Sequence, residues 1–156
     1  MGLSRQGQGS LMKITILAVG RLKEKYFLDA VGEYRKRLGR YAKIEITEVE
    51  DEAVPEHASA KEEERIKLRE GERLFSRIPD GAYVIALAID GQAPDSVELS
   101  KKISRLGLEG KSHLCFLIGG SLGLSGQILE RADEKMSFSR LTFPHQLMRV
   151  ILLEQL

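Results

Sequence analysis

The sequence contains no tryptophan, a single cysteine and no long hydrophobic run. Aromatic residues make up only 6% of the chain, so it has no belt of the kind that anchors proteins at a membrane interface. The apolar runs at 83–89 and 114–118 are far shorter than the roughly 20 residues that span a bilayer. We therefore expect both runs to be buried strands of a protein that contacts no membrane, and the single cysteine indicates a cytoplasmic location.

Several sets of chemistry-bearing residues are also missing. The lone Cys115 excludes an internal disulfide framework, and its apolar surroundings predict an inert core thiol. No group of His, Cys, Asp and Glu has the spacing of metal ligands, so no metal site is expected. No Gly-x-Ser-x-Gly elbow occurs, which argues against a hydrolase of that type.

Residues 1–11 are polar and have neither the basic stretch nor the apolar core of a secretion signal. We interpret them as a disordered extension or a cloning remnant, with Met12 as the native start. Residues 12–156 are enough for one compact domain with its own core. The composition, 42% hydrophobic and 30% charged, is that of an ordinary globular protein.

The net charge of +1 hides a strong local asymmetry. Residues 13–43 contain nine basic and three acidic side chains, whereas residues 48–72 contain four basic and ten acidic ones. One predicted helix carries a basic side formed by Arg35, Lys36, Arg37 and Arg40. This side is either an ordinary solvated face or a surface that neutralises RNA phosphates.

Hydrophobic periodicity predicts alternating strands and helices. The expected strands are 13–19, 44–49, 82–89, 113–118 and 136–143. The expected helices are 25–41, 60–77, a segment capped by Asp95 or Ser96 that runs to 106, 125–132 and 145–156. Asp90-Gly91 is expected to end its strand, and the helix at 60–77 is expected to bury Ile66, Leu68, Leu74 and Phe75. This alternation predicts an α/β fold with a mostly parallel sheet.

Ligands of open α/β sheets bind beyond the carboxyl ends of the strands, and three strand ends carry suggestive residues, at 87–91, 118–123 and 141–144. Gly119-Gly120-x-x-Gly123 lacks the Gly-Lys-Ser/Thr of a Walker loop and does not follow the first strand, as a dinucleotide fingerprint would. Taken alone, this loop is either a ligand loop or a tight turn. Arg149 needs a partner in its apolar context, which is Glu154, another chain or a substrate phosphate.

Three motifs in this order make the chain recognisable. They are Lys13-Ile-Thr-Ile-Leu-Ala-Val-Gly-Arg-Leu-Lys-Glu, then Phe116-Leu-Ile-Gly-Gly-Ser-Leu-Gly-Leu-Ser125, then Leu141-Thr-Phe-Pro-His-Gln-Leu-Met-Arg-Val150. The chain resembles the bacterial 23S rRNA pseudouridine-N3 methyltransferase family H of the SPOUT superfamily over essentially all of residues 12–156. The resemblance implies a mostly parallel sheet with helices on both faces and a C-terminal trefoil knot.

The resemblance also implies a function. The methyl donor is S-adenosylmethionine, no metal takes part, and the substrate is a pseudouridine in 23S rRNA of the ribosome or large subunit. The protein is expected to be a homodimer with its active site near the subunit interface. The positions that match the family's cofactor site are Leu87, Gly119, Phe138, Ser139, Arg140, Leu141, Thr142 and Phe143.

Methyl transfer to N3 of pseudouridine requires removal of a weakly acidic proton before or during attack. A base, or a donor that stabilises the resulting oxyanion, would assist this step. Of the residues that lie in the motifs shared with the family, His145 and Arg149 are the candidates for this role. His145 follows a proline at a helix start, where its ring could instead cap the helix.

One departure from the family leaves alternatives open. Family members continue past the helix that begins at His145, with a Tyr-Arg-Ala stretch and a Pro-Tyr-His-like tail, whereas this sequence stops at Leu156. A domain without the tail could be catalytically incomplete and act as a ribosome- or RNA-binding module. A weaker alternative is a flavodoxin-like nucleotide binder that holds a phosphate at Gly119.

Overall fold

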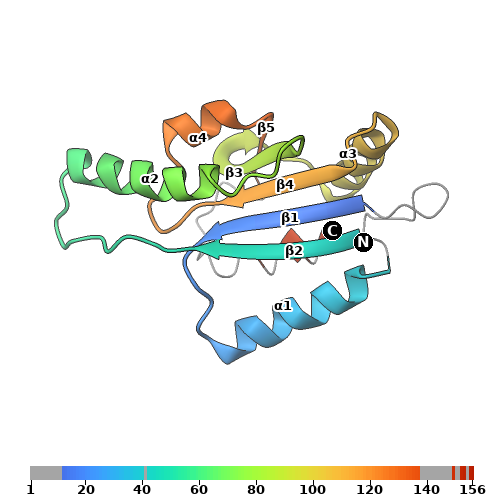
Figure 1. Ribbon diagram of the computed structural model, residues 1–156, viewed down its shortest axis with the longest axis horizontal. Coiled ribbons are helices and arrows are strands. Elements are labelled where there is room, and N and C mark those ends of the chain that lie inside the picture. Colours follow the sequence, from blue (N-terminus) through green and yellow to red (C-terminus); the bar gives the residue numbers. More distant parts are fainter. Residues whose placement is uncertain (1–11, 41, 138–148, 150–151, 154) are drawn as a thin grey trace.

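Figure 1 shows the computed structural model, which describes residues 12–40, 42–137, 149, 152–153 and 155–156. Among these residues, five strands form one sheet in the order β2-β1-β4-β3-β5, and every pairing between them is parallel. The strands are β1 Met12–Val19, β2 Ala42–Val49, β3 Tyr83–Gln92, β4 His113–Ile118 and β5 Glu134–Met136. The predicted parallel α/β fold is confirmed.

Helices connect the strands and begin at residues that cap them. They are α1 Lys25–Leu38, α2 Ala60–Phe75, α3 Ser96–Leu108 and α4 Gly126–Arg131. Ser59 with Glu62 and Asp95 with Glu98 form capping boxes at α2 and α3, and the Ser125 hydroxyl accepts the Ile128 amide at α4. Asp95, rather than Ser96, is therefore the cap of α3.

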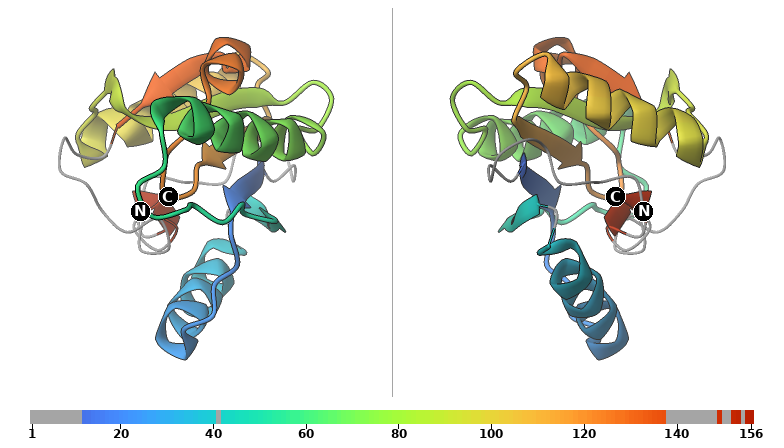
Figure 2. Two further views of the ribbon diagram at one scale, coloured as in Figure 1. Left: turned by 90° about the vertical axis from the view of Figure 1, so that its left-hand side faces the viewer. Right: turned by 90° about the vertical axis from the view of Figure 1, so that its right-hand side faces the viewer.

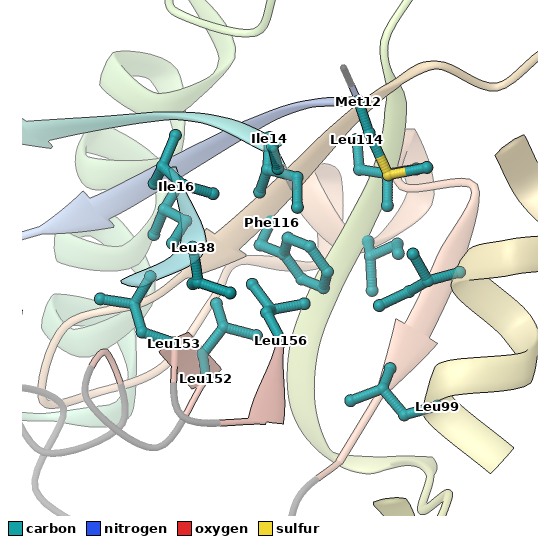
Figure 3. Close-up of a cluster of buried hydrophobic side chains, with 14 of the residues drawn as sticks. Met12, Ile14, Ile16, Leu38, Leu99, Leu114, Phe116, Leu152, Leu153 and Leu156 are labelled. Atoms are coloured by element: carbon teal, nitrogen blue, oxygen red, sulfur yellow. The ribbon is translucent and has the colours of Figure 1, made fainter. Parts of the chain in front are cut away.

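The helices cover both faces of the sheet, because the central strands are apolar on both sides. On one face, alternate residues of β1 and β4 pack against α1, α3 and the chain end, and Figure 3 shows Leu152, Leu153 and Leu156 beside Ile16, Leu38 and Phe116. On the other face, Leu17 and Leu117 pack with Leu74 of α2 and Ile128 of α4. Figure 2 shows α1 standing away from the rest of the described molecule.

The predicted buried stripe of α2 is partly wrong. Ile66 and Leu74 are buried, but Leu68 is 41% exposed and Phe75 is 50% exposed. Glu70 is buried in their place, together with Gly71. Residues 66, 70 and 74 follow one another at intervals of four and share one face, so helix geometry and not apolar character decided which side chains are buried.

Several predicted boundaries also shift. Strand β3 runs past Asp90-Gly91 to Gln92, because the segment bulges instead of ending: Leu87 and Gln92 both pair with Met136. Helix α1 ends at Leu38, not at 41, and α3 continues through Gly107 to Leu108 before Gly110 takes a φ of 85°. Strand β5 begins two residues earlier than predicted, at Glu134, and ends at Met136, where the prediction has it begin; residues 138–143 of the predicted strand lie outside the described residues.

The expected knot and the helix that begins at His145 involve residues 138–148, which lie outside the described residues. Arg149 and residues 152–153 and 155 have helical backbone, in line with the predicted helix.

Candidate functional site

Parallel pairing places the carboxyl ends of the strands at one edge of the sheet, where the arrowheads of β1, β2 and β4 point in Figure 1. The last residue pair in the register between β3 and β4 is Ala86 with Leu117. Leu87 therefore lies one residue, and Gly119 two residues, beyond that pair. The structure brings these two predicted cofactor residues close to the point where the pairing between β3 and β4 ends, although β3 itself continues to Gln92.

The chain leaves β5 at the same place. Met136 pairs with Leu87, and the Ser137 amide donates to the Gln92 carbonyl at 2.8 Å. A Cβ at Gly91 would lie 2.7 Å from the Met136 nitrogen, so this glycine permits the close backbone contact. The other predicted cofactor residues follow directly, but Phe138, Ser139, Arg140, Leu141, Thr142 and Phe143 lie outside the described residues.

The loop that follows β4 is closed on itself. The Gly123 amide donates to the Gly120 carbonyl at 3.0 Å, and Gly123 has a φ of 85° that a side chain rarely adopts. A Cβ at Gly119 would lie 2.6 Å from the Gly123 carbonyl carbon. Gly119 is buried, and the loop's own fold requires a glycine here, because the Gly123 backbone fills the space of a side chain.

Helix α2 places a buried carboxylate directly behind this loop. Glu70 is only 4% exposed, and its Oε2 accepts the Glu52 amide at 3.0 Å. Its oxygens lie 3.2 and 3.4 Å from the position that a Gly120 Cβ would take, and no described residue donates a hydrogen bond to Oε1. Burial raises the pKa of Glu70, and the neighbouring Asp51 adds to the rise while the Glu52 amide opposes it.

Sequence reasoning missed Glu70, although one signal was present. A glutamate stands at position 70, between Ile66 and Leu74, on the line that the helix buries. An acid at the centre of such a line is unusual, because a buried carboxylate costs free energy unless it is paired. A test of helical spacing that ignored residue type would have found it.

Arg149 is fully buried and has found partners far away in the sequence. Its Nη1 forms an ion pair with Glu48 at the end of β2, and its Nη2 donates to the carbonyls of Val19 at 3.1 Å and Gly20 at 2.6 Å. Glu48 Oε2 also accepts the Leu22 amide at 2.8 Å. Arg149 thus joins the chain end to the carboxyl ends of β1 and β2, through a partner that none of the sequence alternatives named.

The second catalytic candidate, His145, lies outside the described residues. Only Nε of Arg149 lacks a hydrogen-bond partner among the described residues, so most of its donor capacity is already used within the protein. Burial lowers the pKa of this guanidinium, and Glu48 opposes that effect. The arrangement is that of a group that positions the strand ends.

The surroundings of the site are strongly charged. The segment after β2 carries Glu50, Asp51 and Glu52, and Arg73 binds two of these residues, with Nη1 on the Glu50 carbonyl at 2.8 Å and Nη2 on the Glu52 carboxylate at 2.5 Å.

Within the described ranges, no three residues of the metal-ligating types gather into a possible metal site. No helix of the described chain is long and apolar enough to cross a membrane.

A hollow of about 710 Å³ lies where β3 leads into α3. It is lined by Gln92, Ala93, Pro94, Glu98, Lys101, Lys102 and Arg105. Lys102 forms an ion pair with Glu134, which also accepts the Tyr83 hydroxyl at 3.0 Å. Three of the lining side chains are basic, and one of them, Lys102, is already paired with Glu134.

Comparison with known proteins agrees with this geometry. A family model described as a predicted SPOUT methyltransferase matches residues 12–156. The ribosomal RNA large subunit methyltransferase H of Bifidobacterium adolescentis is 60% identical over 145 residues, covering 93% of this chain and 91% of that protein. Proteins of the same name from Clostridioides difficile and Bacillus pumilus are 54% and 56% identical, covering 93% and 92% of this chain and 91% of each relative.

The comparisons give the same family as the sequence motifs. The parallel sheet with a glycine loop at its carboxyl edge is consistent with that family. The chain is a methyltransferase and belongs to the SPOUT methyltransferase family.

Proposed function

We propose that this protein transfers a methyl group from S-adenosylmethionine to N3 of a pseudouridine in 23S rRNA of the large ribosomal subunit. The observation that supports it most is the meeting of Leu87, Gly119 and the start of the segment after β5 at one edge of the sheet. This geometry occurs in a chain whose relatives are named as methyltransferases of large-subunit ribosomal RNA.

The described residues fit such a cofactor. Leu87 packs against the apolar cluster and offers one wall of a slot for the adenine ring. The buried Gly119 lets the loop close against Gly123, and this would set the path of the loop beside the ribose or the methionine arm. The backbone of residues 138–143 would bind the adenine edge, and S-adenosylmethionine supplies the electrophilic methyl group when it is bound.

On the protein side, the reaction needs removal of the N3 proton and alignment of the nucleobase at near-attack distance. His145 remains the candidate for a base or an oxyanion donor. Arg149 contributes by holding the ends of β1 and β2 and the chain end together, through Glu48 and the carbonyls of Val19 and Gly20.

The partners follow from the same assignment. The substrate is rRNA in the assembled subunit or ribosome, the protein acts in the cytoplasm as a homodimer, and no metal takes part. The exposed cations Lys36 and Arg40 would contact RNA phosphates, whereas Arg35 and Arg37 are tied to the Ile44 carbonyl and to Glu33.

The test is mass-spectrometric mapping of rRNA after unmethylated ribosomes are incubated with the protein and S-adenosylmethionine. We expect one added methyl group at a single pseudouridine, and Gly119→Val, which disrupts the proposed cofactor loop, should abolish it. If no methylation is found, calorimetry with S-adenosylhomocysteine distinguishes two explanations. Cofactor binding without methylation would favour a ribosome-docking module, and no binding above millimolar affinity would reject the cofactor site itself.

A further inference from the structure

The strongest unexplained feature of the molecule is the buried carboxylate of Glu70. A leucine or methionine at this position would continue the apolar line from Ile66 to Leu74. Instead the helix buries an acid with one oxygen that no described residue bonds, an arrangement that costs stability. A polar group that is buried in a core at a cost in stability is a candidate for a functional role.

Helix α2 contacts the glycine loop at two points, with Glu70 near Gly120 and with Gly71 near Ser125. The carboxylate lies behind Gly120, next to the proposed cofactor contact at Gly119. The following residue, Gly71, packs so closely that a Cβ there would lie 2.7 Å from Ser125 Oγ, at the cap of α4. Helix α2 therefore sets the position of the negative charge relative to the loop.

The negative charge is not cancelled by its described neighbours. Asp51 and Glu52 lie close enough to influence the titration of Glu70, and Arg73, a cation that also influences it, is bound to Glu52. Beside the loop, the carboxylates of Glu70, Asp51 and Glu52 therefore outnumber the cation Arg73, while Arg149 at the same edge is paired with Glu48. In a buried site such an excess of negative charge is screened less than in water, and it favours a positively charged ligand.

We propose that Glu70 is a specificity-determining residue of the cofactor site, where its buried carboxylate favours a positively charged methyl donor over the neutral product of transfer. This inference rests on the proposed function. S-adenosylmethionine carries a sulfonium cation, whereas S-adenosylhomocysteine is a neutral thioether with otherwise the same adenosine and amino-acid groups. Glu70 thereby helps the product to leave after the methyl group has been transferred.

The experiment measures, by calorimetry, the affinities of wild-type protein and Glu70→Gln for three ligands. These are S-adenosylmethionine, S-adenosylhomocysteine and the cationic analogue sinefungin, in which an amine replaces the sulfonium group. We expect Glu70→Gln to weaken both cationic ligands about five- to tenfold, because a charge–charge interaction in the site is lost. The affinity for S-adenosylhomocysteine should change by less than about twofold.

Glu72→Gln is the matched control, because it removes the same charge from the exposed side of the same helix. It should leave all three affinities unchanged. A folding control follows from the raised pKa of Glu70: the ionised form is disfavoured in the fold, and stability is lost as pH rises through that pKa. Near neutral pH, Glu70→Gln should therefore be at least as stable as the wild type.

An equal loss of affinity for all three ligands would mean that Glu70 only holds the loop, and it would overturn the proposal. Unchanged affinities would overturn it as well. If the wild-type protein binds none of the three ligands, the proposed function fails instead, so the two failures are distinguishable.

Discussion

At the scale of single residues, the positions that matter most are those where a side chain is absent or hidden. Gly119 is such a position, because its missing side chain allows the loop to close against the Gly123 backbone. Arg149 and Glu70 are the opposite case, since each places a charged group in the interior.

We predict that Gly119→Ala lowers the affinity for S-adenosylhomocysteine at least about tenfold, a loss of about 1.4 kcal/mol. The added methyl group would meet the backbone of Gly123 and push the loop away from its position. Calorimetry measures this, with Gly126→Ala as the control, because a Cβ at Gly126 meets no atom within 4 Å. Wild-type affinity in Gly119→Ala would show that the pocket is misplaced.

We predict that Arg149→Met lowers the free energy of unfolding by about 3 kcal/mol, because Glu48 and two carbonyls lose their buried partner. Arg37→Met, which removes an exposed i,i+4 pair with Glu33, should cost less than about 1 kcal/mol. Urea denaturation of both variants provides the comparison. If the two losses are equal, Arg149 does not position the strand ends.

At the scale of the elements, α1 and α2 differ in how much of each helix is buried and in the charged side chains that each presents. Only Leu38 of α1 is buried, and the helix carries cations along an exposed side. Helix α2 packs against the sheet through a line that includes Glu70, and it presents the acid to the glycine loop. The basic excess seen in the sequence lies on α1, whereas α2 carries five acidic and five basic residues. The acidic excess comes from residues 48–56, which contain five acidic side chains and no basic one.

We predict that Lys36→Gln combined with Arg40→Gln weakens binding to large ribosomal subunits. Each lost phosphate contact should reduce the slope of log affinity against log salt by about 0.7–0.9. The control is Lys61→Gln with Arg65→Gln, which removes two exposed cations one turn apart on α2. A filter-binding titration at several salt concentrations distinguishes them, and equal effects of the two double variants would argue against an RNA surface on α1.

At the scale of the whole molecule, the central strands β1 and β4 connect the two hydrophobic clusters. Cys115 lies in the middle of β4 and is completely buried, and burial raises the pKa of its thiol to about 12. The thiol therefore reports on opening of the sheet as a whole.

We predict that Cys115 does not react with a thiol reagent in the native protein, and that its labelling rate rises only as denaturant unfolds the chain. Because the chain has one cysteine, the entire signal comes from this site. Circular dichroism recorded in the same denaturant series gives the global unfolding curve for comparison. Rapid labelling without denaturant would mean that β4 opens locally.

The sequence by itself determined the alternation of strands and helices, the capping serine of α4 and the glycine loop, because these depend on local periodicity and on the backbone freedom of glycine. It also determined the family, through motifs that are local in sequence. The tertiary structure alone decided the partner of Arg149, which is 101 residues away, and the burial of Glu70, which the predicted buried stripe of α2 did not include. Contacts of this kind depend on how the parallel strands align their ends, and that alignment is set by packing between distant segments.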